Sequence, residues 1–172
     1  ERISGTAMAD SEFGMRAFSA AQEGIQNEVR ERVRQQRLQA LTADGRRLFR
    51  DGIGRQIMAL ELQDFDKIGE NVDELSRYLQ EDGADRGISP SESRQEFLKV
   101  LEDSVNALAL EDPGRAAELA ERAGKVQQGG TRMDDPGTES SLKIQDLTHR
   151  MRLAAEDKRV RKINLRHNTS GA

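Results

Sequence analysis

The sequence predicts an all-α protein: an elongated array of helices and helical hairpins with a shallow core, forming part of a larger oligomeric assembly. Three observations lead to this prediction. Apolar residues recur at helical spacing along most of the 172 residues, and strand patterns are nearly absent. Two segments open with a capping residue followed by proline, which is typical of helix starts. Only 35% of the residues are hydrophobic whereas 34% are charged, so each helix can bury only a narrow stripe.

Residues 1–43 are predicted to form one long amphipathic helix. Its apolar face consists of Met15, Phe18, Ala21, Ile25, Val29, Val33 and Ala40. The stretch "TADGRR" is expected to end this helix, because Asp44 and Gly45 favour a turn. Residues 44–70 are expected to be an irregular or kinked helical segment, since Gly52 and Gly54 each cost about 1 kcal/mol inside a helix.

Residues 71–125 are predicted to be helical, beginning with a helix that starts near Asn71 and ends just before Gly83. Residues 89–124 within this region are predicted to form a helical hairpin. Ser89, Pro90 and Glu92 form an S-x-x-E capping box with proline at the first helical position.

The second helix of the hairpin is thin, because its apolar face is mostly alanine. Asp112 is its expected N-cap, Pro113 its first residue and Gly124 its end. We expect this face to pack on the preceding helix across the short "LEDP" turn. The residues predicted to meet are Phe97, Leu101, Val105 and Leu108 on one helix and Ala116, Leu119, Ala120 and Ala123 on the other.

The remainder is predicted to be a linker at 126–137, a C-terminal helix at 138–167 with a basic end, and a tail at 168–172. The linker is rich in Gly and Asp. The basic end supplies the candidate residues for contact with DNA or a neighbouring subunit. These are Lys158, Arg159, Arg161, Lys162 and Arg166.

Charge alternates along the chain. The net charge is +2 for residues 1–60, −10 for 61–112, −1 for 113–140 and +5 for 141–172. Such alternation suits contact between subunits, where an acidic patch meets a basic one. The alternative is that these clusters are simply solvated helix faces.

No catalytic residue, metal site, cofactor or small-molecule substrate is expected, so the sequence predicts a protein that is not an enzyme. The chain has no cysteine. Asp146 and His149 have the helical spacing of a bundle metal site but lack a second motif, and are expected to be a surface polar pair. No apolar run reaches the roughly 20 residues of a membrane span, so we expect a soluble chain.

The order of these segments resembles the helical region of the internal virion proteins of short-tailed phages, the core or ejection proteins. The resemblance covers about residues 65 to 160. It rests on the succession from "GENVDELSRYL" through the capped "SPSESRQEFLKVLEDSVNAL" and "EDPGRAAELAERAG" to "TESSLKIQDLTHRMRLAAEDK". Because those chains are several times longer and this one starts at Glu1, we expect a piece of a longer protein.

The resemblance implies a non-enzymatic structural role: a homo-oligomeric ring or tube around the genome exit path of a phage DNA-ejection apparatus. Its implied partners are other internal virion proteins, the portal and, without sequence specificity, DNA. The implied location is the virion interior, with ejection into the host cell envelope on infection after synthesis in the host cytoplasm.

A helical adaptor or scaffold remains the alternative. In that case the acidic segment 61–112 would bind one basic partner protein, and salt would weaken the complex.

Overall fold

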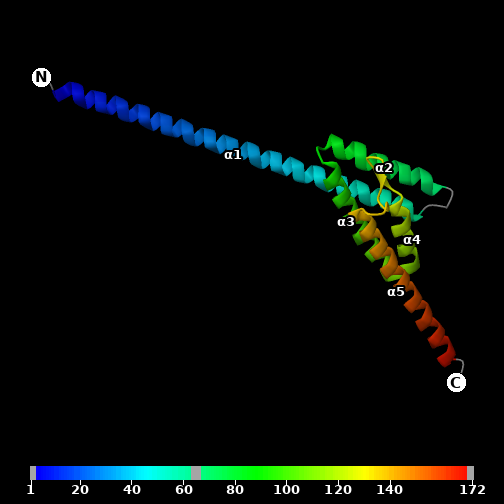
Figure 1. The fold of residues 1–172 in the computed structure, drawn as a ribbon. Coiled ribbons are helices and arrows are strands. Elements are labelled where there is room, and N and C mark those ends of the chain that lie inside the picture. The colour runs from blue at the N-terminus through cyan, green and yellow to red at the C-terminus, as the bar shows by residue number, and fades with distance from the viewer. Residues whose placement is uncertain (1–2, 63–66, 170–172) are drawn as a thin grey trace. The chain divides into compact units, whose positions relative to one another are not determined.

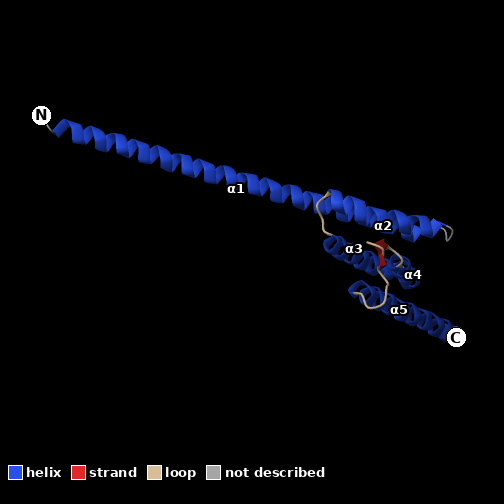
Figure 2. Cartoon of the chain, turned by 45° about the horizontal axis from the view of Figure 1, so that its top comes forward, coloured by secondary structure: helices blue, strands red, loops and turns tan. Residues whose placement is uncertain are grey.

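Helices make up nearly all of the computed structural model, which describes residues 3–62 and 67–169, and side chains at 13–62 and 67–166. The helices are α1 (Ile3–Leu62), α2 (Ile68–Asp85), α3 (Pro90–Glu111), α4 (Pro113–Gly124) and α5 (Glu139–Thr169). Strands β1 (Gln127–Gln128) and β2 (Thr131–Arg132) form one antiparallel pair (Figures 1 and 2). The predicted all-α class is confirmed.

The chain divides into two compact units. The N-terminal unit is Glu1–Asp44 and holds the first part of α1. The C-terminal unit is Gly45–Ala172 and holds the last part of α1 together with α2, α3, α4, α5 and the strand pair.

Helix α1 continues to Leu62, so the predicted break at 42–47 and the predicted irregular segment from residue 44 are wrong in the part of α1 that the structure describes. A glycine costs only about 1 kcal/mol in a helix. The turns that follow Gly45 are anchored by Phe49 and Ile53, which are both completely buried. Packing therefore outweighs the local preference for a turn. Residues 63–66 of the predicted segment lie outside the described residues.

Gly52 allows α1 and α2 to approach closely, rather than kinking α1. A Cβ atom at Gly52 would lie only 1.8 Å from Oη of Tyr78. The Tyr78 hydroxyl donates a hydrogen bond of 3.3 Å to the Phe49 carbonyl, and the two rings stack with centroids 5.5 Å apart. Burial, with a smaller contribution from the charge of Asp82, raises the pKa of Tyr78. The space that a side chain at position 52 would occupy is thus filled by the Tyr78 ring.

One core in the C-terminal unit collects an apolar stripe from each helix. Its main members are Phe49, Ile53, Ile57, Leu60, Leu75, Leu79, Phe97, Leu101, Val105, Leu119, Ile144, Leu147 and Met151. Helix α4 contacts both α3 and α5. Its alanines Ala116, Ala120 and Ala123 are completely buried, because small side chains let both neighbours come close. The thin helix is therefore packed on two sides, not only against α3.

Helix α2 ends later than predicted. Gly83 was expected just beyond the helix, but α2 begins at Ile68 and continues to Asp85. Gly83 is buried, and a Cβ there would lie 3.5 Å from the Phe49 ring. The turn uses Gly87 instead, whose φ of +68° suits a residue without a side chain.

Both predicted helix starts in the hairpin are confirmed. The Ser89 hydroxyl accepts a hydrogen bond from the Glu92 amide at 3.3 Å, and the Glu92 carboxylate accepts one from the Ser89 amide at 3.0 Å. Asp112 Oδ1 accepts hydrogen bonds from the amides of Gly114 and Arg115 at 3.0 and 3.2 Å. Each cap satisfies amides that have no partner within the helix.

The predicted linker 126–137 contains a small β-hairpin. Gly129 and Gly130 have φ values of +61° and +80°, as a two-residue turn of type I′ requires, and join β1 to β2. Val126 and Met133 flank the hairpin and are buried. Helix α5 then starts at Glu139, where the Thr138 hydroxyl accepts from the Ser141 amide at 3.1 Å. It ends at Thr169, and residues 170–172 of the predicted tail lie outside the described residues.

Candidate functional site

The face of α5 that packs into the core changes character along the helix. Ile144, Leu147 and Met151 are buried against the rest of the C-terminal unit. Beyond them α5 runs past α3 and α4 (Figure 1), and every side chain from 156 to 166 is exposed. Steps of three and four residues carry the same face on to Lys158 and Lys162. The face of α5 that is apolar and buried up to Met151 is therefore basic and exposed from Lys158 onward.

Four of the five predicted contact residues share this side of α5. Lys158, Arg159, Lys162 and Arg166 lie within about 100° of the helix circumference, and are called the basic face below. Arg161 lies about 110° from the middle of that arc and is not part of it. Only four of the five predicted contact residues therefore form one continuous surface.

Lys158 serves the fold as well as the basic face. Its ammonium group donates a hydrogen bond of 2.6 Å to the carbonyl of Glu111, the last residue of α3. A cation at a helix C-terminus satisfies a carbonyl without an internal partner and complements the helix dipole. Arg159 and Lys162 form no ion pair with any residue that the structure describes. These two side chains are the ones available for a partner.

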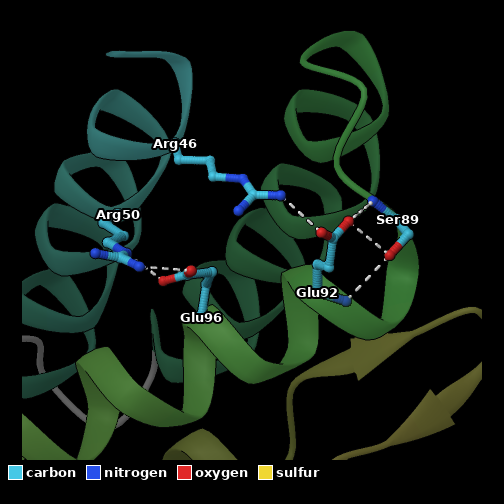
Figure 3. A network of polar contacts seen from close by, with 5 residues as sticks. All are labelled: Arg46, Arg50, Ser89, Glu92 and Glu96. Atoms are coloured by element: carbon cyan, nitrogen blue, oxygen red, sulfur yellow. Dashed lines mark hydrogen bonds and ion pairs between the residues drawn. The ribbon is translucent and has the colours of Figure 1, made fainter. Parts of the chain in front are cut away.

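Part of the acidic segment 61–112 is paired with arginines inside the C-terminal unit. The Arg46 guanidinium donates to Glu92 at 2.7 Å, and Arg50 binds Glu96 through two nitrogens (Figure 3). Arg115 of α4 donates to Glu61 through one nitrogen at 2.9 Å. These contacts hold α1 against α3 and α4, so their carboxylates belong to the packing of the helices.

The network shifts the acidity of its members. Hydrogen bonds from Arg50 lower the pKa of Glu96, and the same contact raises the pKa of Arg50. The pKa of Glu92 is lowered chiefly by the hydrogen bond from the Ser89 amide, with Arg46 contributing less. Both carboxylates are therefore held in the charged form that their partners require.

A second charged surface lies on α2. Five exposed acidic residues follow one side of this helix, and Arg77 lies among them, which leaves a net charge of −4. None of the five forms a salt bridge with another described residue. They are Glu70, Asp73, Glu74, Glu81 and Asp85, called the acidic face below. The sequence indicated only a broad acidic segment, since it could not separate these residues from the acids paired within the unit.

Two open grooves border α4. The larger, about 640 Å³, lies between α2 and α4, and Val72, Asp73 and Arg122 are among its lining residues. His149 lines the second, about 440 Å³. Asp146, its predicted polar partner, instead accepts a hydrogen bond of 2.9 Å from Arg150. Among the described residues, no group of three or more acidic or histidine side chains is arranged to hold a metal ion.

Comparison with known proteins identifies no relative: no family model, curated protein or solved structure matches the chain. Within the described residues, no helix is both long enough and apolar enough to cross a membrane.

Proposed function

We propose that the chain is a structural, non-enzymatic subunit that assembles into a homo-oligomeric ring or tube, as the internal core proteins of short-tailed phages do. The observation that carries the proposal is the pair of charged surfaces on the C-terminal unit. The basic face of α5 and the acidic face of α2 have opposite charge, and Arg159 and Lys162 have no ion-pair partner within the described residues.

Such a pair of surfaces suits head-to-tail association. If the basic face of one copy binds the acidic face of the next, the contact is heterologous, and repetition about an axis closes a ring. Exposed charges contribute little to the stability of a fold but strongly affect encounter between molecules. Within a virion interior, the same cations would also suit the phosphate backbone of DNA in the exit path. Other internal virion proteins and the portal are the further partners of this proposal.

The mass of the intact chain at low and high salt tests the ring. We expect one large closed oligomer at low salt and its dissociation at high salt, because screening weakens contacts between exposed charges. Arg159→Glu with Lys162→Glu should give monomers or small species at low salt. Arg161→Glu is the control, since it changes charge on the same helix but on another side. If the oligomeric mass changes neither with salt nor with the double substitution, this contact does not assemble the chain.

The phage assignment has its own test, the protein content of purified virions of the source phage. The proposal requires this polypeptide inside the capsid and its loss from particles that have ejected their DNA. If virions lack it, the ejection role is wrong even when rings form.

The acidic face favours one second candidate, an adaptor that binds a basic protein. The adaptor is monomeric alone and forms a binary complex that Glu74→Lys with Glu81→Lys abolishes. A monomer at low salt whose binding to a basic partner is lost in that variant favours the adaptor over the ring.

A further inference from the structure

An unpartnered apolar stripe follows α1 through the N-terminal unit. Its large side chains are well exposed, with Phe18 70%, Ile25 63% and Val29 55% accessible. Two glutamines and an alanine continue the stripe, and at 100° per residue all its members fall within about 80° of the helix circumference. The members are Phe18, Gln22, Ile25, Val29, Val33, Gln36 and Ala40, called the seam below.

The seam is symmetric about Val29. Successive members are separated by 4, 3, 4, 4, 3 and 4 residues, so the spacing is the same in both directions. Members equally far from Val29 are alike in polarity or complementary in size. Ile25 corresponds to Val33 and Gln22 to Gln36, whereas the large Phe18 corresponds to the small Ala40. We propose that the seam binds the same seam of a second copy in an antiparallel pair, with Val29 on the twofold axis.

In this arrangement each residue of the seam faces a residue of matching polarity or complementary size on the other copy. Ile25 packs on Val33 of the other copy, the glutamine amides face one another, and Phe18 occupies the space beside Ala40. Alternation of large and small side chains across facing positions is what allows two helices to interdigitate. A twofold contact also uses one patch on both copies, so a single self-complementary surface suffices.

Charges beside the seam complement each other in the same register. A perpendicular twofold axis places each side of the seam against the same side in the other copy. Glu28 then lies beside Arg32 of the partner, and Glu23 lies beside Arg37 of the partner, each within about 3 Å along the axis. Arg30 and Glu28 lie on opposite sides of the seam, and each approaches its own counterpart near the axis, which gives two like-charge contacts. Two kinds of opposite-charge pair, each formed twice, outnumber them.

The parallel alternative fits less well. In an in-register parallel pair, residues five apart on opposite flanks approach each other, so Arg32 lies beside Arg37 of the partner. Phe18 would also meet Phe18, and Ala40 would meet Ala40, which leaves one layer crowded and another empty. The antiparallel order avoids both problems.

Helix energetics provide a reason for the pairing. Most helical stability in proteins comes from packing an amphipathic face rather than from intrinsic helix propensity. Residues 13–44 expose every described side chain. Association of two seams supplies packing of the kind that α2, α3 and α4 provide for the last turns of α1. This inference does not rest on the proposed ring, because it concerns a different surface.

Disulfide trapping in the full chain tests the pairing, and the absence of natural cysteines makes it clean. Val29→Cys should form a disulfide-linked dimer at least about tenfold faster than Asn27→Cys, because pairing raises the effective thiol concentration to the millimolar range. Asn27 is the matched control, two residues away on the opposite side of α1. Equal rates for the two variants would overturn the proposal.

Direction is tested with two further single-cysteine variants. Phe18→Cys and Ala40→Cys should each dimerise poorly alone but cross-link rapidly when mixed, because only an antiparallel pair brings these positions together. Rapid dimerisation of Phe18→Cys alone would show a parallel pair and overturn the antiparallel assignment. Circular dichroism of the reduced variants verifies that the helix content is unchanged, which the exposure of both positions leads us to expect.

Discussion

Helix α1 passes through both units, and its apolar side chains have opposite environments in them. In the C-terminal unit Phe49, Ile53 and Leu60 are completely buried. In the N-terminal unit Phe18 and Ile25 have accessible fractions of 70% and 63%. The local pattern is helical in both, so the difference lies in what covers the stripe. One part of α1 therefore completes a core within the chain, whereas the other presents an exposed apolar stripe, to which our proposal assigns a second copy of the chain.

The largest effect is expected from opening the core of the C-terminal unit. Leu101→Ala removes a completely buried side chain between the helices of the hairpin and should lower the free energy of unfolding by about 2–5 kcal/mol. Chemical denaturation followed by circular dichroism measures it. Leu110→Ala on the same helix is the control, because Leu110 is 87% exposed and its loss should change the stability by less than about 0.5 kcal/mol. Equal effects would mean that the core is misassigned.

The next effect separates two glycines in the buried part of α1. Gly52→Ala should destabilise the chain by about 1–3 kcal/mol, because the added Cβ overlaps the Tyr78 ring. Gly54→Ala should instead stabilise it by up to about 1 kcal/mol, since its Cβ would meet Val100 at an ordinary 3.9 Å and alanine favours helix.

A thermal unfolding series of these variants measures both signs. In a Tyr78→Ala background, Gly52→Ala should become neutral or favourable, as expected for two residues whose effects are coupled. If Gly52→Ala stabilises the original chain, the close approach of α1 and α2 is wrong.

A smaller, pH-dependent effect is expected from the pair of Arg50 and Glu96. Glu96→Gln should cost about 1 kcal/mol at neutral pH, since the carboxylate is only 16% exposed but Arg50 remains partly solvated. Arg50 lowers the pKa of Glu96 below its ordinary value of 4.5, so the stabilisation is complete above about that pH. It is lost as the pH falls through the lowered folded-state pKa.

Denaturation midpoints from pH 7 to pH 2 follow this loss. The difference in denaturation midpoint between the original chain and Glu96→Gln should disappear in acid. A difference that stays constant with pH would exclude ionisation of Glu96 as its cause. Glu102→Gln is a useful comparison, because its contact with Arg150 is longer at 3.8 Å and more exposed.

The smallest effect on folding is expected at the basic face. Neutralising Arg159 and Lys162 to Gln should change the free energy of unfolding by less than about 0.5 kcal/mol, because neither has an ion-pair partner within the described residues. The same change should weaken assembly or DNA binding, measured by light scattering and by gel shift. A large loss of stability would place these residues in the fold rather than on a contact surface.

Local signals predicted the helices well but could not predict what interrupts or covers them. Ser89 and Asp112 act as caps because their hydrogen bonds involve neighbours in sequence. Gly45 and Gly52 do not break α1, because the burial of Phe49 and the approach of Tyr78 stabilise the helix there. Both are long-range effects that local sequence does not reveal. The hairpin at 127–132 was predictable in principle from Gly129 and Gly130, yet its strands are too short to give an alternating pattern.

The candidate site was predicted in part for the same reason. Helical spacing from Lys158 to Arg166 could be read directly, and it already sets Arg161 apart from the others. The bond from Lys158 to the end of α3 required the tertiary fold. Which acids of the segment 61–112 are paired also depended on arginines such as Arg50 and Arg115, far away in sequence from Glu96 and Glu61.

Amide hydrogen exchange of the full chain, measured at a dilution where it is monomeric and at a concentration where it self-associates, tests the contrast within α1 most directly. We expect amides of residues 45–62 to be strongly protected at both concentrations, because the core of one chain holds them. Amides of residues 13–44 should exchange rapidly in the monomer and become protected only on association. Equal protection of both parts in the monomer would contradict the account.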